Sequence, residues 1–144
     1  MSRVLALDYG RARCGCAISD PTGTVATPLP AIERAPTRRG LASVATLVAE
    51  TGAERVVVGL PLTLAGREGD QANETRAFSE RLARLVRVPV ELHDERLTTV
   101  QAARSGRAGR PASSEDSRAA AHLLESYLAS PVAEQPGAGE DGAG

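Results

Sequence analysis

Aromatic side chains and lysine are the two main gaps in this sequence of 144 residues. There is no tryptophan, Phe78 is the single phenylalanine, and aromatic residues make up 2% of the chain against 42% for hydrophobic residues as a whole. The core must therefore be built from Val, Leu, Ile and Ala. A protein that binds single strands by stacking bases on aromatic platforms carries more rings than this, so we do not expect that mode of binding.

All 17 basic residues are arginine. Codon usage in a GC-rich genome explains this, but the consequence is physical: arginine binds phosphate through two parallel hydrogen bonds, whereas lysine acts as a point charge. The net charge is −1, and residues 1–129, which hold all the arginines and 15 of the 18 acidic residues, carry +2. Charge alone therefore does not indicate a nucleic-acid partner, and the argument must come from sites.

The length of the chain is that of one domain, large enough to bury a core without metals or disulfides. We expect this domain over residues 1–129 and a disordered tail over 130–144, where Pro, Gly, Ala and acidic residues dominate. Cys14 and Cys16 fit neither a zinc site nor a disulfide framework. We expect them to point to opposite faces of a strand, unbonded, in a reducing compartment such as the bacterial cytoplasm. We expect neither a signal peptide nor a membrane span.

Hydrophobic patterning predicts three consecutive strands followed by alternating helices and strands. The expected strands cover residues 3–8, 14–19, 24–32, 55–60 and 88–93. The expected helices cover residues 37–51, 71–86, 98–104 and 114–129. Pro28 and Pro30 suit an edge strand. This order predicts an α/β fold with a five-stranded mixed sheet, in which the first three strands are antiparallel, βαβ units follow, the first strand is central and helices flank the sheet.

Three carboxylates stand at the ends of these elements. Asp8 ends the first strand, Glu95 follows the fifth, and Asp116 lies in the first turn of the last expected helix. Because sites collect at the carboxyl ends of parallel strands, we expect the three acids to converge at one edge of the sheet. Converging acids repel one another unless a cation compensates them, and oxygen ligands select Mg²⁺ or Mn²⁺. Two such ions would support in-line displacement at phosphorus.

Each acid also has a purely structural interpretation. Asp116 is suited to a helix N-cap or first turn, Asp8 to a turn, and Glu95 to a solvated loop. His93 and His122 are expected to be structural. The catalytic interpretation therefore depends on the joint pattern and not on any single acid.

Four blocks stand in a fixed order along the chain. They are DYGRARCGCA at 8–17, VGLPL at 58–62 followed by Gly66, Gly69 and Gln71, DERLTT at 94–99, and DSRAA at 116–120 followed by two leucines and Tyr-Leu at 127–128. Together they resemble the YqgF family, also called the RuvX or Holliday junction resolvase family. The resemblance covers residues 3–129, and it departs from the family at Ala12 and Ala65, where Lys and Asp are frequent.

The resemblance implies a ribonuclease H-like fold, with Asp8, Glu95 and Asp116 as the metal-binding catalytic acids. It implies a hydrolase of phosphodiester bonds that processes the 5′ end of pre-16S rRNA in a ribosomal precursor particle, or one that resolves Holliday junctions in branched DNA. Symmetric junction cutting requires a homodimer, whereas a trimming nuclease can be a monomer. Two other classes stay open: one half of an actin-like ATPase, whose phosphate loop the first hairpin also resembles, and a non-catalytic nucleic-acid-binding scaffold.

Arginines near the three acids are expected to bind phosphates and to position the substrate without reading its sequence. They are Arg11, Arg13, Arg96, Arg104, Arg107, Arg110 and Arg118. An ordinary solvated surface is the alternative for each of them. We expect the loop at 105–113 to be a flap that the substrate orders. Gly10, Gly59 and Pro61 are expected to form the active-site loops, since glycine lets a backbone approach closely.

Overall fold

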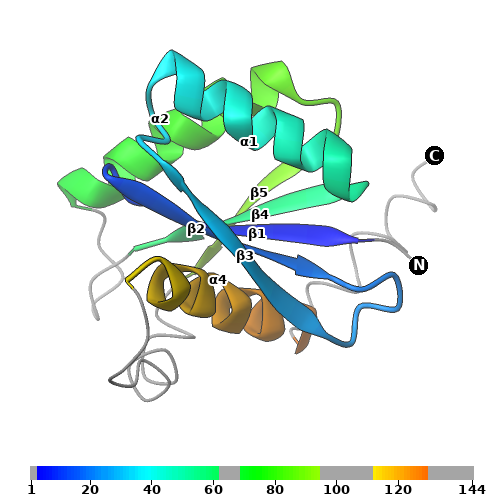
Figure 1. Ribbon diagram of the computed structural model, residues 1–144. Coiled ribbons are helices and arrows are strands. Elements are labelled where there is room, and N and C mark those ends of the chain that lie inside the picture. The colour runs from blue at the N-terminus through cyan, green and yellow to red at the C-terminus, as the bar shows by residue number, and fades with distance from the viewer. Residues whose placement is uncertain (1–2, 62–68, 95–111, 130–144) are drawn as a thin grey trace.

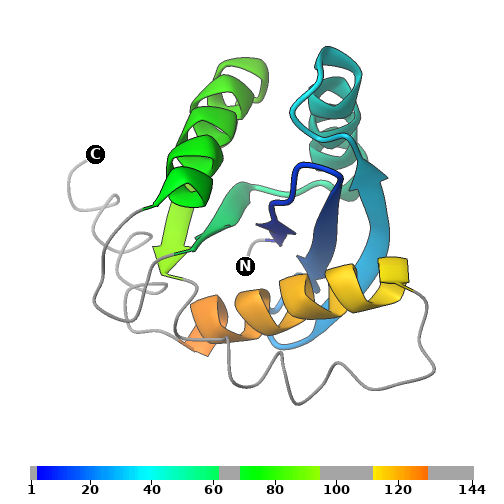
Figure 2. The ribbon, with the colours of Figure 1, turned by 90° about the vertical axis from the view of Figure 1, so that its left-hand side faces the viewer.

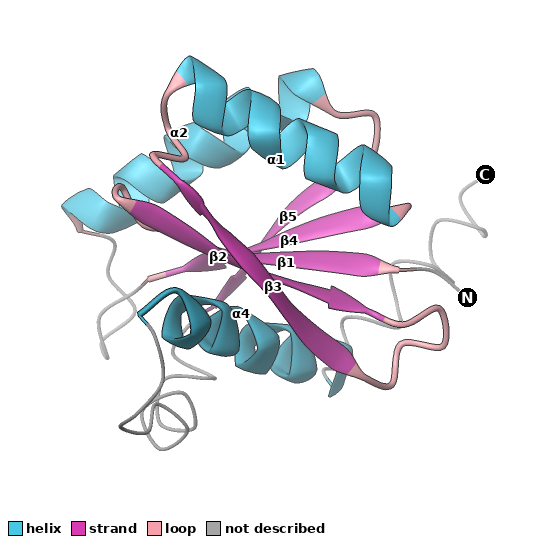
Figure 3. Cartoon of the chain, in the orientation of Figure 1, coloured by secondary structure: helices cyan, strands magenta, loops and turns pink. Residues whose placement is uncertain are grey.

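The computed structural model describes residues 3–61, 69–94 and 112–129, and of residues 112–116 it describes the backbone only. These residues form five strands and three helices (Figure 1; Figure 3 shows the same elements by type). The elements are β1 (Val4–Asp8), β2 (Arg13–Ser19), β3 (Ala26–Glu33), α1 (Arg38–Thr51), β4 (Arg55–Leu60), α2 (Asp70–Leu85), β5 (Val90–Asp94) and α4 (Ala112–Ala129).

The five strands form one mixed sheet in the order β3-β2-β1-β4-β5. Strand β2 pairs antiparallel with both β1 and β3, whereas β1, β4 and β5 run parallel to one another. The predicted sheet is therefore confirmed, including the central place of β1. The prediction of an edge strand is confirmed as well, since β3 lies at the edge with Pro28 and Pro30 exposed.

The sheet is covered on both faces. Helices α1 and α2 pack on one face and α4 crosses the other (Figures 1 and 2). Alternate residues of β1 serve the two sides: Leu5 and Leu7 belong to the core cluster under α1 and α2, and Val4 and Ala6 to the cluster under α4. This is the period of two that a strand imposes on its side chains. The same alternation tells which face of the sheet each further residue of a strand points to.

The expectation for the cysteines is wrong in one respect. Cys14 and Cys16 are free and fully buried, but both belong to the core cluster under α1 and α2. Residues two apart in a strand share a face, so opposite faces were not to be expected. The Cys16 thiol donates to the Cys14 carbonyl over 3.5 Å, so both cysteines act as small buried residues.

The last helix begins earlier than the sequence predicts. Helix α4 starts at Ala112, so residues 112 and 113 are helical and not part of the expected loop. Asp116 is consequently the fifth residue of the helix, and the interpretation as an N-cap or first-turn acid is wrong. The expected helix at 98–104, the rest of the loop at 105–113 and the tail at 130–144 lie outside the described residues. Within the described part of the chain, no helix is long and apolar enough to cross a membrane.

Candidate active site

Asp8 is the last residue of the central strand and is half-buried. It pairs with Gly15 on β2, and the strand alternation that puts Val4 and Ala6 under α4 puts Asp8 on the same face. The carboxyl ends of β1 and β4 lie together because these strands are parallel neighbours, and they form the edge of the sheet that is made of strand ends. Asp8 therefore stands where ligand sites of open α/β sheets are found.

The amino-terminal half of α4 is joined to the same part of the sheet through Ser117. The Ser117 hydroxyl donates to the Leu29 carbonyl of β3 and accepts from the Cys16 amide of β2 over 3.4 Å. Cys16 pairs with Leu7, the residue before Asp8, and Ser117 directly follows Asp116. The Ser117–Cys16 hydrogen bond and the pairing of Cys16 with Leu7 thus connect the backbone of Asp116 to that of Asp8, and α4 packs against β1.

The third acid, Glu95, follows β5 in the sequence. Residues Gly59 and Leu60 of β4 pair with His93 and Asp94 of β5, so the two strands end together, and Glu95 is the next residue of the chain. Glu95 itself lies outside the described residues. Among the residues that the structure does describe, no three His, Cys, Asp or Glu form a group able to hold a metal ion.

The loop between β1 and β2 is held by two contacts with α2. The Tyr9 ring packs against Phe78 with 4.6 Å between ring centroids, and the Arg11 guanidinium lies 2.7 Å from the Glu74 carboxylate. Burial, assisted by Glu74, raises the pKa of Tyr9 above its usual value of 10.0. Arg11 keeps 76% of its side-chain surface exposed, so the ion pair does not remove it from solvent.

Of the expected loop residues, Gly10 has the clearest structural reason. A Cβ at this position would lie 2.5 Å from the Arg13 carbonyl oxygen, so only glycine fits the turn. Gly59 lies in β4, two residues after Val57, whose side chain faces α4. Alternation along the strand puts Gly59 on that same face, which is also the face of Asp8. Pro61 ends the described part of this segment and is half-buried.

The expected phosphate-binding arginines are only partly described. Arg13 is exposed at the start of β2, and Arg118 is half-buried on α4, with an Nε that has no hydrogen-bond partner in the described part of the chain. The others, Arg96, Arg104, Arg107 and Arg110, lie outside the described residues, as does most of the expected flap. The structure thus brings Arg11 and Arg13 to the edge that carries Asp8.

Both histidines make structural contacts. His93 Nε2 lies 3.2 Å from the Ser126 hydroxyl, and its ring meets Tyr127 edge-on with 5.6 Å between centroids. Burial lowers the pKa of His93 from its usual 6.5, although Asp94 and Glu91 oppose that shift. His122 Nδ1 lies 3.2 Å from the Glu125 carboxylate, one turn along α4. These contacts are those expected of structural histidines.

Two residues of this region escaped the sequence analysis. Ser117 was not distinguished from the other polar residues at the start of the last helix, and Glu74 stood on the solvent side of an amphipathic helix. Their partners, Leu29 and Arg11, are distant in the sequence. No local pattern signals either contact.

The fold recurs in solved structures of other proteins. Thermus thermophilus RuvC aligns with 87% of this chain and 94% of its own at a TM-score of 0.56 and 18% sequence identity. T. thermophilus RuvC in complex with a Holliday junction substrate aligns with 88% and 94%, at a TM-score of 0.56 and 17% identity. The fold is therefore that of the ribonuclease H-like α/β proteins. Residues 2–130 match the family model described as "RuvX: Holliday junction resolvase", so the chain belongs to the RuvX family.

Curated relatives agree with this assignment. A protein of Chloroflexus aggregans is 45% identical over 130 residues, covering 87% of this chain and 92% of its own length. A protein of Mycobacterium ulcerans is 46% identical over 132 residues, covering 88% and 78%. Both bear the name "Putative pre-16S rRNA nuclease". The predicted family and the predicted class, a nuclease that hydrolyses phosphodiester bonds, are confirmed.

Proposed function

We propose that this protein is a metal-dependent nuclease that processes the 5′ end of pre-16S rRNA, with Asp8, Glu95 and Asp116 as its catalytic acids. One observation carries the proposal: Asp8 ends the central strand on the face that α4 covers, and Ser117 joins the start of α4 to the strands beside it. The names of the curated relatives supply the substrate. A ribosomal precursor particle is the partner that this substrate implies, and the cytoplasm is its compartment.

The residues present suit a divalent cation. Asp8 and Asp116 belong to elements in contact, and Glu95 directly follows a strand that ends at the same edge. Carboxylate oxygens are the ligands that Mg²⁺ and Mn²⁺ prefer, whereas zinc sites recruit cysteine or histidine. Here both cysteines are buried in the core, and the two histidines are half-buried beside Ser126 and Glu125. Two such ions, when bound, supply the charge compensation and the activated water for in-line displacement at phosphorus.

The protein's own residues have separate roles in this proposal. The three acids hold the cations, and the Gly59 and Gly10 backbones leave room for the substrate strand. Arg11, Arg13 and Arg118, together with Arg96, Arg107 and Arg110, neutralise phosphates and fix the position of the strand. None of these contacts reads a base, so the choice of substrate depends on its shape.

Resolution of Holliday junctions is the second candidate function, favoured by the family description and by the fold shared with RuvC. It uses the same acids but requires two sites that act together, hence a homodimer. A non-catalytic scaffold that binds structured nucleic acid is the alternative of another class. The nuclease would cut precursor RNA, the resolvase would cut DNA junctions, and the scaffold would cut neither.

The experiment compares wild-type protein with Asp8→Asn on three labelled substrates: the 5′ end of pre-16S rRNA, a mobile four-way DNA junction and plain single-stranded RNA. Each is incubated with Mg²⁺, Mn²⁺ or EDTA. The matched control is Glu54→Gln, which changes an exposed carboxylate between α1 and β4, at the opposite edge of the sheet. We expect metal-dependent cutting of the precursor RNA, a loss of at least about 100-fold in Asp8→Asn as for other groups that stabilise transition-state charge, and none in the control.

The other outcomes decide between the alternatives. Symmetric cutting of the junction by a dimer would support the resolvase. Tight binding to all three substrates without cutting, in any metal, would contradict the catalytic role of the acids and support the scaffold.

A further inference from the structure

A second basic surface lies at the same end of the sheet as the candidate active site, at the turn between β3 and α1 and on the face that α1 covers. Strand β3 is antiparallel to β2, which is antiparallel to β1, so β3 ends at the same edge of the sheet as β1. Arg34 follows β3, and its amide donates to the Ala12 carbonyl of the β1–β2 loop over 2.8 Å. Two strand spacings across the sheet and about three residues along it separate Arg34 from Asp8, which puts this turn roughly 14 Å from the end of β1.

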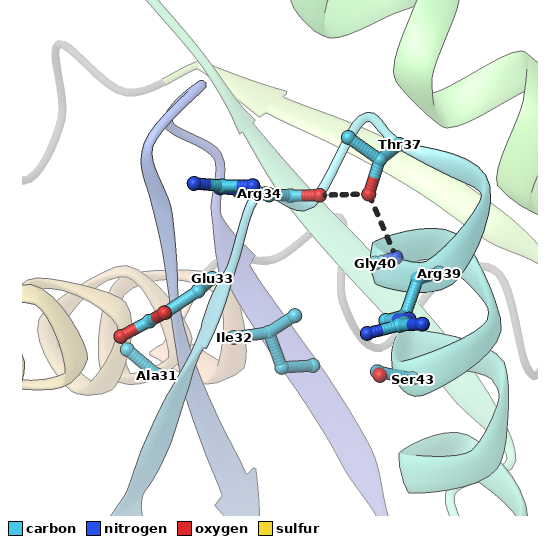
Figure 4. A pocket seen from close by; sticks show the side chains of 8 residues that line it. All are labelled: Ala31, Ile32, Glu33, Arg34, Thr37, Arg39, Gly40 and Ser43. Atoms are coloured by element: carbon cyan, nitrogen blue, oxygen red, sulfur yellow. Dashed lines mark hydrogen bonds between the residues drawn. The ribbon is translucent and has the colours of Figure 1, made fainter.

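The turn borders a hollow of about 630 Å³ that is open to solvent, and basic and hydroxyl side chains line it together with Ala31 and Ile32 (Figure 4). Arg34 and Arg39 line it together with Thr37 and Ser43, and Glu33 is the single acidic residue of the lining. Arg34 and Arg39 are exposed, and neither pairs with a carboxylate in the described part of the chain. Exposed, unpaired guanidinium groups at a hollow suit the phosphates of a ligand.

The neighbouring helix adds positive potential to this hollow. Helix α1 begins here, its first turn contains no acidic residue, and the exposed Arg38 stands at its first position. Helix amino termini and arginine side chains both attract anions. Three arginines against Glu33 leave the surface around the hollow with net positive charge.

Hydrogen bonds hold the backbone of this turn, which fixes the positions from which its arginine side chains extend. Arg34 has a φ of 51°, a left-handed conformation uncommon for a residue other than glycine. Its carbonyl accepts from the Thr37 hydroxyl over 2.7 Å, and that hydroxyl accepts from the Gly40 amide over 3.0 Å (dashed lines in Figure 4). An arginine is thus kept in a conformation that glycine or asparagine would adopt at less cost.

We propose that Arg34 and Arg39, supported by Arg38, bind the phosphates of the nucleic-acid strand that runs to the bond cleaved at Asp8. The proposal rests on the proposed function, which supplies the strand. Arg11 on the β1–β2 loop and Arg13 at the start of β2 lie between Arg34 and Asp8 along the strand pairing, so these arginines form a track along one end of the sheet. The track binds the sugar-phosphate backbone and reads no base.

The test measures binding as a function of salt, with cleavage prevented by EDTA. The probes are a labelled single-stranded RNA of about 20 nucleotides and a four-way DNA junction. Arg34→Gln/Arg39→Gln is compared with wild type and with a control, Arg84→Gln/Arg87→Gln. The control removes two exposed arginines near the start of β5, at the end of the sheet opposite to the one where β1 ends. Thermal melting of each variant verifies that it is folded.

Each phosphate contact contributes about 0.7 to the slope of log K against log salt for single strands and about 0.9 for B-DNA. We therefore expect Arg34→Gln/Arg39→Gln to lower the slope by about 1.4 on the RNA, and to weaken binding about tenfold or more at low salt. We expect Arg34→Lys/Arg39→Lys to retain the slope, and the control to retain both slope and affinity. In cleavage assays the loss should fall on KM and not on kcat.

An unchanged slope in a folded Arg34→Gln/Arg39→Gln variant would overturn the proposal. So would competition by inorganic phosphate at the hollow without any change in nucleic-acid binding, because the hollow would then be an anion site only. A wild-type protein that binds through Arg34 and Arg39 but cuts nothing would overturn the proposed function and leave this inference standing.

Discussion

Single residues tie distant segments together around the candidate site, and Ser117 is the clearest case. It is 1% exposed, and its one hydroxyl serves as donor to β3 and acceptor from β2. A buried backbone group that loses its partner retains the full cost of its desolvation. Besides the apolar packing of α4, this one side chain therefore helps to position the start of the helix and with it the backbone of Asp116.

We expect Ser117→Ala to lower the free energy of unfolding by about 1–3 kcal/mol, because it leaves the Leu29 carbonyl and the Cys16 amide without this partner. Urea unfolding measures the change. Ser43→Ala, at an exposed position of α1, is the matched control and should change stability by less than about 0.5 kcal/mol. Equal stability of the two variants would show that Ser117 does not anchor α4.

Asp20 organises the turn between β2 and β3. Its carboxylate accepts hydrogen bonds from the Thr22 hydroxyl and, over 2.7 and 2.9 Å, from the Thr24 and Val25 amides. The Thr22 bond and then the Val25 amide lower the pKa of Asp20 from 3.8 to about 2. A carboxyl group with a lowered pKa stabilises the folded state above its unfolded pKa, and this contribution is lost as the pH falls through the folded pKa.

Wild type should therefore be more stable than Asp20→Asn above about pH 4, with the difference disappearing between about pH 4 and pH 2. Urea midpoints measured at several pH values for both proteins give the comparison. A difference that stays constant down to pH 2 would contradict the role of the charge.

At the scale of the elements, the packing of α1 depends on a close approach to the turn before it. A Cβ on Gly40 would lie 2.1 Å from the Arg34 carbonyl oxygen and 2.7 Å from the Ala35 Cα, both of which are backbone atoms. Glycine thus lets the first turn of the helix lie directly on the β3–α1 turn. The general advantage of alanine over glycine inside a helix is outweighed here.

Gly40→Ala is expected to destabilise the protein by about 1–3 kcal/mol, the usual cost of overpacking, although alanine favours helix formation. Thermal or urea unfolding measures it, with Thr46→Ala at an exposed position of the same helix as the control. Because the β3–α1 turn must shift, nucleic-acid binding should weaken as well. A stabilised Gly40→Ala variant would contradict the close contact.

Helix α4 is fixed at its other end by a network that crosses to β4 and β5. The Tyr127 hydroxyl donates to Glu91 and accepts from Arg55, both over 3.0 Å, and Arg55 lies 3.2 Å from Glu91. With Ser117 at one end and Tyr127 at the other, α4 spans the sheet from β3 to β5. That span brings a carboxylate-bearing helix to the edge where β1 ends.

At the scale of the whole molecule, the acids that the proposed function requires lower the stability of the metal-free folded state. Three acids gathered without a cation repel one another, whereas a cation that binds only the folded state stabilises it by about 2.7 kcal/mol at a concentration of 100 times its Kd. Removing one acid relieves the repulsion and removes the binding energy. The proposed function therefore couples metal binding and stability through Asp8.

We expect metal-free Asp8→Asn to melt at the same temperature as metal-free wild type or above it. Saturating Mn²⁺ should raise the melting temperature of wild type by several degrees, as about 2.7 kcal/mol does for a domain of this size, and that of the variant much less. Glu54→Gln should respond to Mn²⁺ as wild type does. A wild-type melting temperature that millimolar Mn²⁺ leaves unchanged would contradict a metal site at Asp8.

The sequence by itself determined the elements, their order and the place of Asp8. The apolar runs of β1 and β4 indicate strands covered on both faces, the prolines of β3 indicate an edge, and helical spacing indicates α1, α2 and α4. These signals are local, because periodicity and backbone preference act within a few residues. The rule that sites collect at the carboxyl ends of parallel strands then brought attention to Asp8 and Glu95.

Only the tertiary structure decided which distant residues meet. Ser117 reaches Leu29 across 88 positions of the chain, Arg11 pairs with Glu74 across 63, and Arg34 lies against Ala12 beside the candidate site. Burial, strand register and close backbone approach select these contacts after the elements have packed. A local pattern contains none of that information, which is why the basic track at the β3–α1 turn could not be found from the sequence.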